Sequence, residues 1–287
     1  MKKLKTGYVG IIGKPNAGKS TLINTIMKRK VSITSYKPQT TRKQITALYN
    51  DSSSSIIFID TPGFHIPHNE FDKFMNKEVK SVYKTVDCLL YLFDPTKEFD
   101  EEDDELIKSI NDFNVKNIIL VLSKQDISST KKNQYSIGVL KQKISFDEVV
   151  EVSSMKNENI DKLLTLIKTK LPLGDKAFSK IEDDDNFVIT EIIREQIIFN
   201  TKKEVPYSVY VEIEQKKFED NIFHISAVIN VEKESQKPIL IGKGGQMIKK
   251  IGVLSRKELL NIYDCKINLK LFVKTTPNWR NDLKLIR

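Results

Sequence analysis

The sequence predicts an α/β domain with a doubly wound, mostly parallel sheet, followed by a smaller α+β domain. Short, continuous apolar runs separated by longer polar stretches indicate strands that are buried on both faces, as in the first domain. Near residue 187 the pattern changes to alternation of apolar and polar residues, which is typical of a sheet with one covered face. The length of 287 residues also favours two domains over one.

The first domain contains six apolar runs that predict strands. They are GYVGII (7–12), ITALY (45–49), SIIFID (55–60), DCLLYLF (87–93), NIILVL (117–122) and EVVEV (148–152). The serine run 52–55 predicts a hairpin turn between the second and third strands. Helices are predicted at 19–29, 104–112 and 162–172, where Pro172 ends the last one. The acidic run 100–105 predicts a solvated helix start.

The second domain is predicted to run helix, strand, strand, helix, helix, strand. The first helix is FVITEIIREQIIFNT (187–201), and the alternating segments are YSVYVEIEQ (207–215), IFHISAVINVE (222–232) and KINLKLFVK (266–274). In the helix before the last strand, a buried face is expected to contain Ile248, Ile251, Ser255, Leu259 and Ile262. The expected bounds are 1–173 for the first domain, 174–186 for a linker and 187–287 for the second domain.

Composition and charge limit the classes of function. The net charge is +9, and residues 235–287 account for it, with 12 Lys and Arg against 3 Asp and Glu. A basic segment around a glycine loop favours a phosphate-rich partner over a merely solvated surface. The apolar run 88–93 is far shorter than the roughly 20 residues of a membrane-spanning helix. The two cysteines, Cys88 and Cys265, suggest neither a disulfide framework nor a metal site, and they fit a reducing cytoplasm.

The segment GKPNAGKS (13–20) carries the strongest chemical signal. It has the pattern G-x-x-x-x-G-K-[ST] and stands between a predicted strand and a predicted helix, where phosphate binding requires it. Gly13 and Gly18 let successive backbone N–H groups face phosphate oxygens. Lys19 can neutralise β- and γ-phosphates, and Ser20 can ligate Mg²⁺. The chain is therefore predicted to bind a nucleoside triphosphate with magnesium.

Later motifs indicate whether the nucleotide is ATP or GTP. Asp60 ends a buried strand in IIFIDTPG, where it can hold Mg²⁺ indirectly, and the N–H of Gly63 can meet a γ-phosphate. Asp126 closes LVLSKQD, and its carboxylate can accept from two guanine N–H donors but would repel adenine. Ser153 and Ser154 follow the last strand in VEVSSMKN. Together with the phosphate loop, these segments resemble the motifs of translation-factor-related GTPases, which implies GTP as the nucleotide.

Several residues depart from that family pattern or refine it. Ser123 stands where the base-recognition motif usually has Asn, and Ser154 stands where Ala usually follows the serine. Ser123 has a hydroxyl but no amide that could donate at one end and accept at the other. One hydrogen-bonded contact between the base pocket and the phosphate loop is therefore expected to weaken, while Asp126 keeps guanine specificity. Phe64 stands where Ras-like proteins have a water-orienting Gln. The resemblance to hydrophobic-substituted GTPases implies slow turnover and a K⁺ site to which Asn16 contributes.

The motifs and the resemblance together assign the residues of the nucleotide site. In SITSYKPQTTRKQI, which looks like a first switch, Thr41 or, as the alternative, Thr40 would close on Mg²⁺ and the γ-phosphate. Catalysis is assigned to Asn16, Lys19, Thr41 and Gly63, and Mg²⁺ to Ser20, Thr41 and Asp60. Nucleotide binding is assigned to Gly13, Lys14, Pro15, Asn16, Ala17, Gly18, Lys19, Ser20, Thr21, Asp60, Thr61, Pro62, Gly63, Phe64, Ser123, Lys124, Gln125, Asp126, Ser153 and Ser154.

A second glycine loop, IGKGGQMIKKIG (241–252), lacks the spacing of a nucleotide phosphate loop. In G-x-x-G, Gly242 and Gly245 let two adjoining helices approach a nucleic-acid strand, and Lys243 adds charge. The loop and the order of elements resemble the type II KH domain, which implies single-stranded RNA as the ligand. RNA binding is assigned to Ile241, Gly242, Lys243, Gly244, Gly245, Lys249, Lys250 and Arg256. The alternative is a helix corner with a solvated basic face. Trp279 and Arg280 are expected to add a stacking and phosphate pair, or Trp279 to pack internally.

Over essentially the whole chain, the two domains with SITSYKPQTTR, DTPGFHIPHN and the closing WRND resemble the Era family of bacterial-type GTPases. The resemblance implies a monomeric GTP-hydrolysing factor, with Mg²⁺ as cofactor, that binds the 3′ region of 16S rRNA and assists assembly of the pre-30S subunit. It implies a cytoplasmic protein, and some family members are also found peripherally at the inner membrane. The rival hypotheses are a nearly inactive, nucleotide-gated RNA-binding scaffold and a tRNA-modification GTPase, for whose additional catalytic domain no segment is recognisable.

Overall fold

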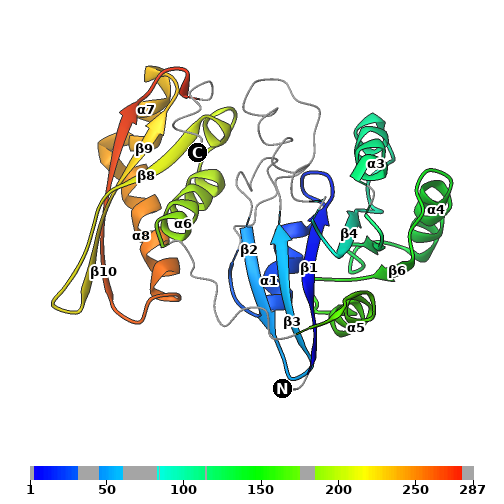
Figure 1. Cartoon of the computed structure of the whole chain (residues 1–287). Helices are drawn as coiled ribbons and strands as arrows, with labels where there is room; N and C mark the ends of the chain where they lie inside the picture. The colour runs from blue at the N-terminus through cyan, green and yellow to red at the C-terminus, as the bar shows by residue number, and fades with distance from the viewer. Residues whose placement is uncertain are drawn as a thin grey trace. The chain divides into compact units, whose positions relative to one another are not determined.

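The chain divides into two compact units, Met1–Ile181 and Glu182–Arg287. The structure is a computed structural model that describes residues 3–31, 45–60, 83, 85–113, 115–174 and 185–279. Figure 1 shows the elements of both units by residue number. Gly174 belongs to the last strand of the first unit and Asp185 to the first helix of the second, so the expected linker 174–186 overlaps an element at each end.

The first unit is built on a sheet with the strand order β2, β3, β1, β4, β5, β6. β2 is antiparallel to β3, as the predicted hairpin requires, and the other neighbours along this path are parallel. The strands are β1 (Leu4–Ile12), β2 (Ile45–Asn50), β3 (Ser54–Asp60), β4 (Cys88–Phe93), β5 (Ile118–Leu122) and β6 (Glu148–Glu151). A short β7 (Leu173–Gly174) pairs antiparallel with the start of β1 and had no counterpart in the sequence prediction.

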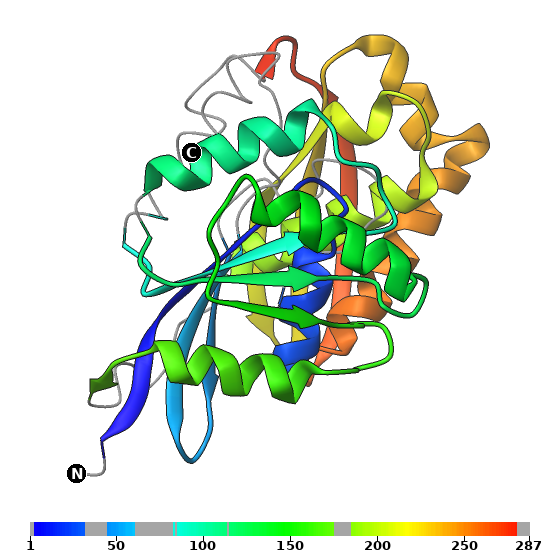
Figure 2. The ribbon, with the colours of Figure 1, turned by 90° about the vertical axis from the view of Figure 1, so that its right-hand side faces the viewer.

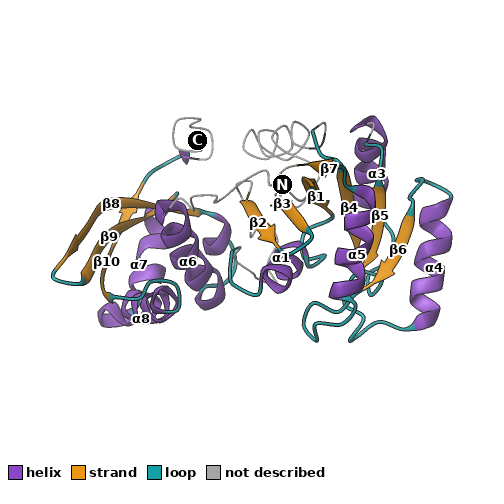
Figure 3. Ribbon diagram, turned by 60° about the horizontal axis from the view of Figure 1, so that its bottom comes forward, coloured by secondary structure: helices purple, strands orange, loops and turns teal. Residues whose placement is uncertain are grey.

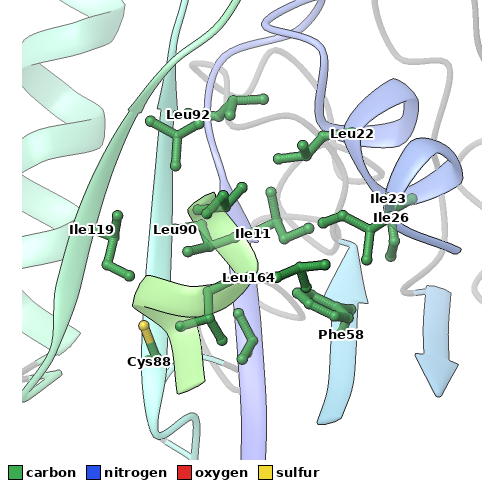
Figure 4. Packing of buried hydrophobic residues seen from close by; sticks show 14 of the residues in the cluster. Ile11, Leu22, Ile23, Ile26, Phe58, Cys88, Leu90, Leu92, Ile119 and Leu164 are labelled. Carbon is green, nitrogen blue, oxygen red and sulfur yellow. The ribbon is translucent and has the colours of Figure 1, made fainter. Parts of the chain in front are cut away.

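Helices cover both faces of this sheet, as the doubly wound prediction requires. They are α1 (Lys19–Met27), α3 (Glu101–Phe113), α4 (Thr130–Lys141) and α5 (Ile160–Lys170), seen around the sheet in Figure 2. Side chains of α1 and α5 belong to one core cluster, and side chains of α3 and α4 belong to the other. Figure 4 shows the first of these clusters.

Strand β4 explains why its sequence is apolar without alternation. Cys88, Leu90 and Leu92 point into the core beneath α1 and α5. Leu89 and Tyr91 point into the opposite core beneath α3 and α4. Since successive side chains of a strand face opposite sides of the sheet, a strand buried on both faces needs apolar residues at every position.

The second unit is a three-stranded sheet with helices on one side, as Figure 3 shows. Its strand order is β10, β9, β8; β8 is antiparallel to β9, and β10 is parallel to it. The predicted order of elements is confirmed. The elements are α6 (Asp185–Asn200), β8 (Val209–Glu219), β9 (Ile222–Val231), α7 (Lys237–Ile241), α8 (Gln246–Leu260) and β10 (Lys266–Thr275), with 3₁₀ turns at Val205–Tyr207, Glu234–Gln236 and Lys243–Gly245.

The predicted buried face of α8 is correct in its middle and wrong at its end. Ile251, Ser255 and Leu259 are fully buried against the sheet. Ile262 is 42% exposed, because α8 ends two residues before it and the chain turns toward β10. Ile248 is half-buried, because it borders a groove rather than the core. The helical period was therefore continued beyond the end of α8, while at its start Ile248 faces the groove and is only partly buried.

Candidate functional site

The phosphate loop lies between the end of β1 and the start of α1. A Cβ atom on Gly13 would lie 2.4 Å from the carbonyl oxygen of Leu92, so only glycine fits there. The N–H of Ala17 donates to the carbonyl of Lys14 at 3.2 Å, which curls the loop. The first N–H groups of α1 have no partner one turn earlier within the helix, so its N-terminus is suited to an anion.

Lys19 is held inside this loop and is only 6% exposed. Its Nζ donates to the carbonyl of Gly13 at 3.0 Å and to the carbonyl of Lys14 at 3.1 Å. Burial lowers the pKa of Lys19 to about 8, although the charge of Asp60 acts in the opposite direction. A buried ammonium group gains most from a bound anion, so this lysine is suited to phosphate oxygens.

Ser20 and Asp60 meet beside the loop. Oγ of Ser20 donates to Oδ2 of Asp60 at 2.9 Å, and Asp60 is fully buried at the end of β3. A hydroxyl and a carboxylate are the hard oxygen donors that Mg²⁺ prefers, and Mg²⁺ usually keeps water ligands and phosphate oxygens beside them. The residues present therefore fit a magnesium ion that is bound together with a nucleotide.

The residues to which the sequence analysis assigned base recognition lie where β5 and β6 end. Oγ of Ser153 donates to Oδ1 of Asp126 at 2.7 Å, and Ser153 is fully buried. The N–H of Gln125 donates to the carbonyl of Val152 at 3.1 Å, which joins the two loops through their backbones. The carbonyl of Ser154 accepts from the hydroxyl of Thr25 on α1 at 3.1 Å. These bonds orient a half-buried Asp126 carboxylate beside the phosphate loop's helix.

Ser123 and Lys124 are both anchored on the end of β4. The hydroxyl of Ser123 donates to the carbonyl of Phe93 at 3.2 Å, and Nζ of Lys124 lies 2.6 Å from Oδ2 of Asp94. Asp94 is 7% exposed, and its other oxygen accepts from the N–H and the hydroxyl of Thr96. Sequence reasoning did not find Asp94, since a single acid after a strand carries no distinguishing pattern.

An ion-pair cluster joins the phosphate loop to α3. Nζ of Lys14 lies 2.6 Å from Oδ2 of Asp100 and 2.9 Å from Oδ2 of Asp103. Burial would lower the pKa of Lys14, but its two acidic partners outweigh burial and raise it. Asp103 is only 2% exposed, so the prediction of a solvated acidic run is wrong for this residue. The acidic run was the available signal, but its contact with a distant lysine depends on the fold.

The structure brings together most of the described nucleotide-site residues. Lys14, Lys19, Ser20 and Asp60 are joined by the contacts given above, and Asp126 is joined to Ser153. Other assigned residues lie outside the part of the chain that the structure describes, and their roles stay predictions. They are Thr40, Thr41, Thr61, Pro62, Gly63 and Phe64.

The second glycine loop lies between α7 and α8. Gly242 has φ 74°, and a Cβ atom there would lie 2.8 Å from the backbone nitrogen of Met247, so the position requires glycine. Its N–H donates to the carbonyl of Pro238 at 2.8 Å, and the N–H of Gly245 donates to the carbonyl of Gly242 at 3.1 Å. The chain therefore leaves one helix and enters the next within a few residues, with the exposed Lys243 at the corner.

A groove of about 440 Å³ runs beside this loop, between α8 and β10. Lys249 and Arg256 line it, and they are among the exposed basic residues assigned to RNA. Its apolar lining was not assigned from the sequence. This lining comprises Ile248, Gly252, Val253, Leu269 and Leu271. Leu269 and Leu271 follow the regular alternation of β10, so no local pattern marks them as groove residues, and only packing shows that they share one groove with residues of α8. Cationic edges around an apolar floor suit phosphates and bases.

Trp279 is not a stacking residue on the surface. It is 3% exposed, its Nε1 donates to the carbonyl of Ser208 at 3.1 Å, and its ring lies 4.9 Å from that of Tyr210. The packing alternative for Trp279 is therefore correct. Arg280, its expected companion, lies outside the described residues.

Other site classes gain no support from the described parts of the chain. In those parts, no group of three or more His, Cys, Asp or Glu side chains is arranged to hold a metal ion. Cys88 and Cys265 are free thiols. None of the helices within the described ranges is long and apolar enough to cross a bilayer.

A phosphate loop, a magnesium-compatible Ser and Asp pair and a half-buried carboxylate at Asp126, followed by a KH-type loop, define the class of RNA-binding GTPases. Residues 8–124 match the family described as "50S ribosome-binding GTPase", and residues 204–280 match the KH domain family. A curated protein named GTPase Era from Ureaplasma parvum serovar 3 is 48% identical over 292 residues, covering 99% of this chain and 96% of the relative. GTPase Era from Clostridium botulinum strain Eklund 17B is 39% identical over 287 residues, covering 99% and 97%.

Solved structures agree with these relatives over both units. A variant of Aquifex aeolicus Era bound to GDP·AlF4⁻ has a TM-score of 0.94 at 36% identity, covering 99% of this chain and 98% of that one. Era in complex with MgGDPNP and nucleotides 1506–1542 of 16S ribosomal RNA has a TM-score of 0.92 at 35% identity, with the same coverage. The chain belongs to the GTPase Era family, and its activity is hydrolysis of GTP. The expected family and fold class are confirmed.

Proposed function

We propose that this GTPase binds the 3′ region of small-subunit (16S) rRNA and assists assembly of the 30S subunit. The observation that carries the proposal is the basic groove beside the G-x-x-G loop, in the same chain as a nucleotide site. The solved Era complex with 16S rRNA nucleotides supports this class of RNA. The proposal includes that the protein is a monomer and that it works in the cytoplasm, where pre-30S subunits form.

The nucleotide would be held by the loops described above. Lys19 would exchange the carbonyls of Gly13 and Lys14 for β- and γ-phosphate oxygens, and Asp126 would accept from guanine. Ser20 would hold Mg²⁺, with Asp60 acting indirectly; the ion would supply positive charge against the phosphates. Thr41 and Gly63 are proposed for the γ-phosphate side.

We also propose that K⁺ supports hydrolysis, with Asn16 as a ligand. Asn16 is exposed on the phosphate loop at φ 64°, so its side chain is accessible from solution. Phosphate release under saturating GTP should be several-fold faster in K⁺ than in Na⁺, and Asn16→Ala should remove that difference. Lys19→Ala should abolish hydrolysis in both salts. Equal rates in K⁺ and Na⁺ for the unchanged chain would exclude the K⁺ proposal and leave GTP hydrolysis intact.

The RNA would be gripped at its sugar-phosphate backbone by the second unit. Gly242 and Gly245 would allow close approach, and Lys243, Lys249 and Arg256 would neutralise phosphates. Ile241, Gly244 and Lys250 complete the proposed set. The apolar floor of the groove would receive unpaired bases.

The proposal is tested by the RNA that copurifies with the full chain. Crosslinking and sequencing should map to the 3′ region of small-subunit rRNA, and occupancy should differ between GTP and GDP. Gly242→Asp with Gly245→Asp should remove the crosslinks while nucleotide affinity stays unchanged. Predominant crosslinks to tRNA, or crosslinks that survive the double substitution, would count against the proposal.

A further inference from the structure

β10 is an edge strand with two chemically different rows of side chains. One row packs toward the helices and the groove, and it contains Ile267, Leu269, Leu271 and Val273. Because successive side chains alternate between the faces of a sheet, the other row points away from the helices. This second row is exposed and consists of Lys266, Asn268, Lys270, Phe272 and Lys274. We call it the outer row of β10.

The outer row combines an exposed ring with unpaired cations. Phe272 is 50% exposed, although it is a large apolar side chain in the middle of a strand. Lys270 and Lys274 stand on either side of it, each about 7 Å away along the strand by the strand repeat. Within the described part of the chain, neither lysine forms an ion pair. The row is therefore not explained by packing or by local charge compensation.

The rest of this face does not share the excess of positive charge. On β9, the cross-strand partners of Lys270 and Phe272 are Ser226 and Val228. On β8, one strand further on, Glu212 and Glu219 face outward, and Glu212 accepts from Asn230 at 3.1 Å. Lys217 on β8 is paired with Glu219 at 2.8 Å. On this face, lysines without an ion pair to another described residue are thus concentrated along the open edge of the sheet.

The edge also adjoins the groove. Leu269 and Leu271 line the groove, while Lys270 and Phe272, their neighbours in sequence, stand on the opposite side of the same strand. A KH loop clamps about four nucleotides, so a longer strand has to leave the groove. Among the described strands none pairs with the outer edge of β10, and a strand of RNA that passes over this edge reaches the outer row directly.

We propose that the outer row of β10 is a second RNA-contacting surface, on which single-stranded RNA leaving the groove stacks a base on Phe272 and sets phosphates against Lys270 and Lys274. A basic track with an interposed aromatic ring is the usual composition of single-strand binding surfaces. The inference rests on the proposed function, because the groove must hold the RNA first. It extends that function from one side of the sheet to both.

The test uses the full chain and two matched triple variants. The outer-row variant carries Lys270→Gln, Phe272→Ala and Lys274→Gln. The control variant carries Lys216→Gln, Lys217→Gln and Phe218→Ala on β8, where the ring is also exposed at 61%. Each variant removes two lysine charges and one exposed ring from a strand; the control differs in that its lysines are ion-paired, Lys216 with Asp185 and Lys217 with Glu219. Thermal melts of both variants establish that they are folded.

The probes are two RNA oligonucleotides from the 3′ region of small-subunit rRNA, one of about five and one of about twelve nucleotides, chosen against the four nucleotides of a KH clamp. The outer-row variant should bind the longer RNA about tenfold or more weakly, since one stacked base and two phosphates are lost. Its slope of log affinity against log salt should fall by about 1.4, at roughly 0.7 for each phosphate of a single strand. Its affinity for the shorter RNA, and both affinities of the control, should not change.

The outcomes separate this inference from the proposed function. Unchanged affinity and salt slope for the longer RNA overturn the inference, even if Gly242→Asp with Gly245→Asp abolishes binding of both probes. If the unchanged chain binds neither RNA probe, the proposed function is wrong as well. Vesicles with anionic lipid are the third probe: if the outer-row variant loses vesicle binding while both RNA affinities stay the same, the row is a membrane contact and the inference is wrong.

Discussion

At residue 94 a buried carboxylate anchors the loop that carries Ser123 and Lys124. The hydroxyl of Ser123 donates to the carbonyl of Phe93, the last residue of β4, at 3.2 Å. Lys124, the next residue, is instead tied to Asp94 at 2.6 Å. The loop of residues 123–126, to which we assigned base recognition, is thereby held on the end of β4, whose position is fixed inside the sheet.

Replacing Asp94 by Asn should therefore weaken guanine nucleotide binding. The amide can still accept from Thr96, but it loses the charge-assisted bond to Lys124, which is worth about 1.5–3 kcal/mol when fully formed. Because Lys124 is 31% exposed, we expect the lower part of that range, about a tenfold rise in the Kd of GDP. Titration with a fluorescent GDP measures it, and Asp112→Asn at an exposed position is the control. An unchanged Kd would mean that Asp94 is dispensable.

Lys19 predicts a pH dependence of nucleotide affinity. Burial lowers its pKa to about 8 in the nucleotide-free protein, whereas bound phosphates favour the charged form and raise it. Above pH 8 the complex then holds more protons than the free protein, so affinity falls as pH rises and is fully present below pH 8. Calorimetry in two buffers at pH 9 should detect proton uptake on binding. Lys19→Arg keeps its charge throughout this range and should remove the uptake; uptake that persists in this variant contradicts the assignment.

At the scale of single elements, the sequence predicted a helix, strand or loop correctly wherever a local residue pattern was sufficient to define it. The unbroken apolar run of β4 predicted burial on both faces, and the alternation of β10 predicted a sheet with one covered face. The two glycine loops were predictable because their spacing reflects backbone geometry. β7 was not predictable, because two residues carry no period. The groove and the pairing of Lys14 with Asp103 depend on which elements pack together, and no local pattern contains that information.

Helix α3 should stabilise the phosphate loop through Asp103. Removing one partner of a buried ion pair costs about 3–5 kcal/mol, but Lys14 keeps its bond to Asp100. We therefore expect Asp103→Asn to lower the free energy of unfolding by about 1–3 kcal/mol. The neighbouring Asp104→Asn is a matched control, because its pair with Lys143 is on the surface and contributes at most about 1 kcal/mol. Urea unfolding of both variants decides the question, and equal losses would show that burial of Asp103 adds nothing.

At the scale of the whole molecule, each unit has its own core. Among the described residues, the buried clusters around the first sheet end at Leu171, and the buried cluster of the second unit begins at Ile189. Two separate cores allow the nucleotide to act on the stability of one unit alone. Any influence of GTP on RNA binding would then be transmitted without unfolding of the second unit.

Calorimetric unfolding of the full chain should therefore show two transitions. Mg·GDP at 100 times its Kd adds about 2.7 kcal/mol to the unit that binds it, so only the first unit's transition should move upward. Leu240→Ala, at a fully buried position of the second core, should lower only the other transition, at a cost of about 2–5 kcal/mol. Leu163→Ala is its counterpart in the first core and should lower the GDP-sensitive transition. A single cooperative transition that responds to GDP and to both substitutions would mean that the two cores unfold together. In that case the nucleotide state directly affects the stability of the RNA-binding unit.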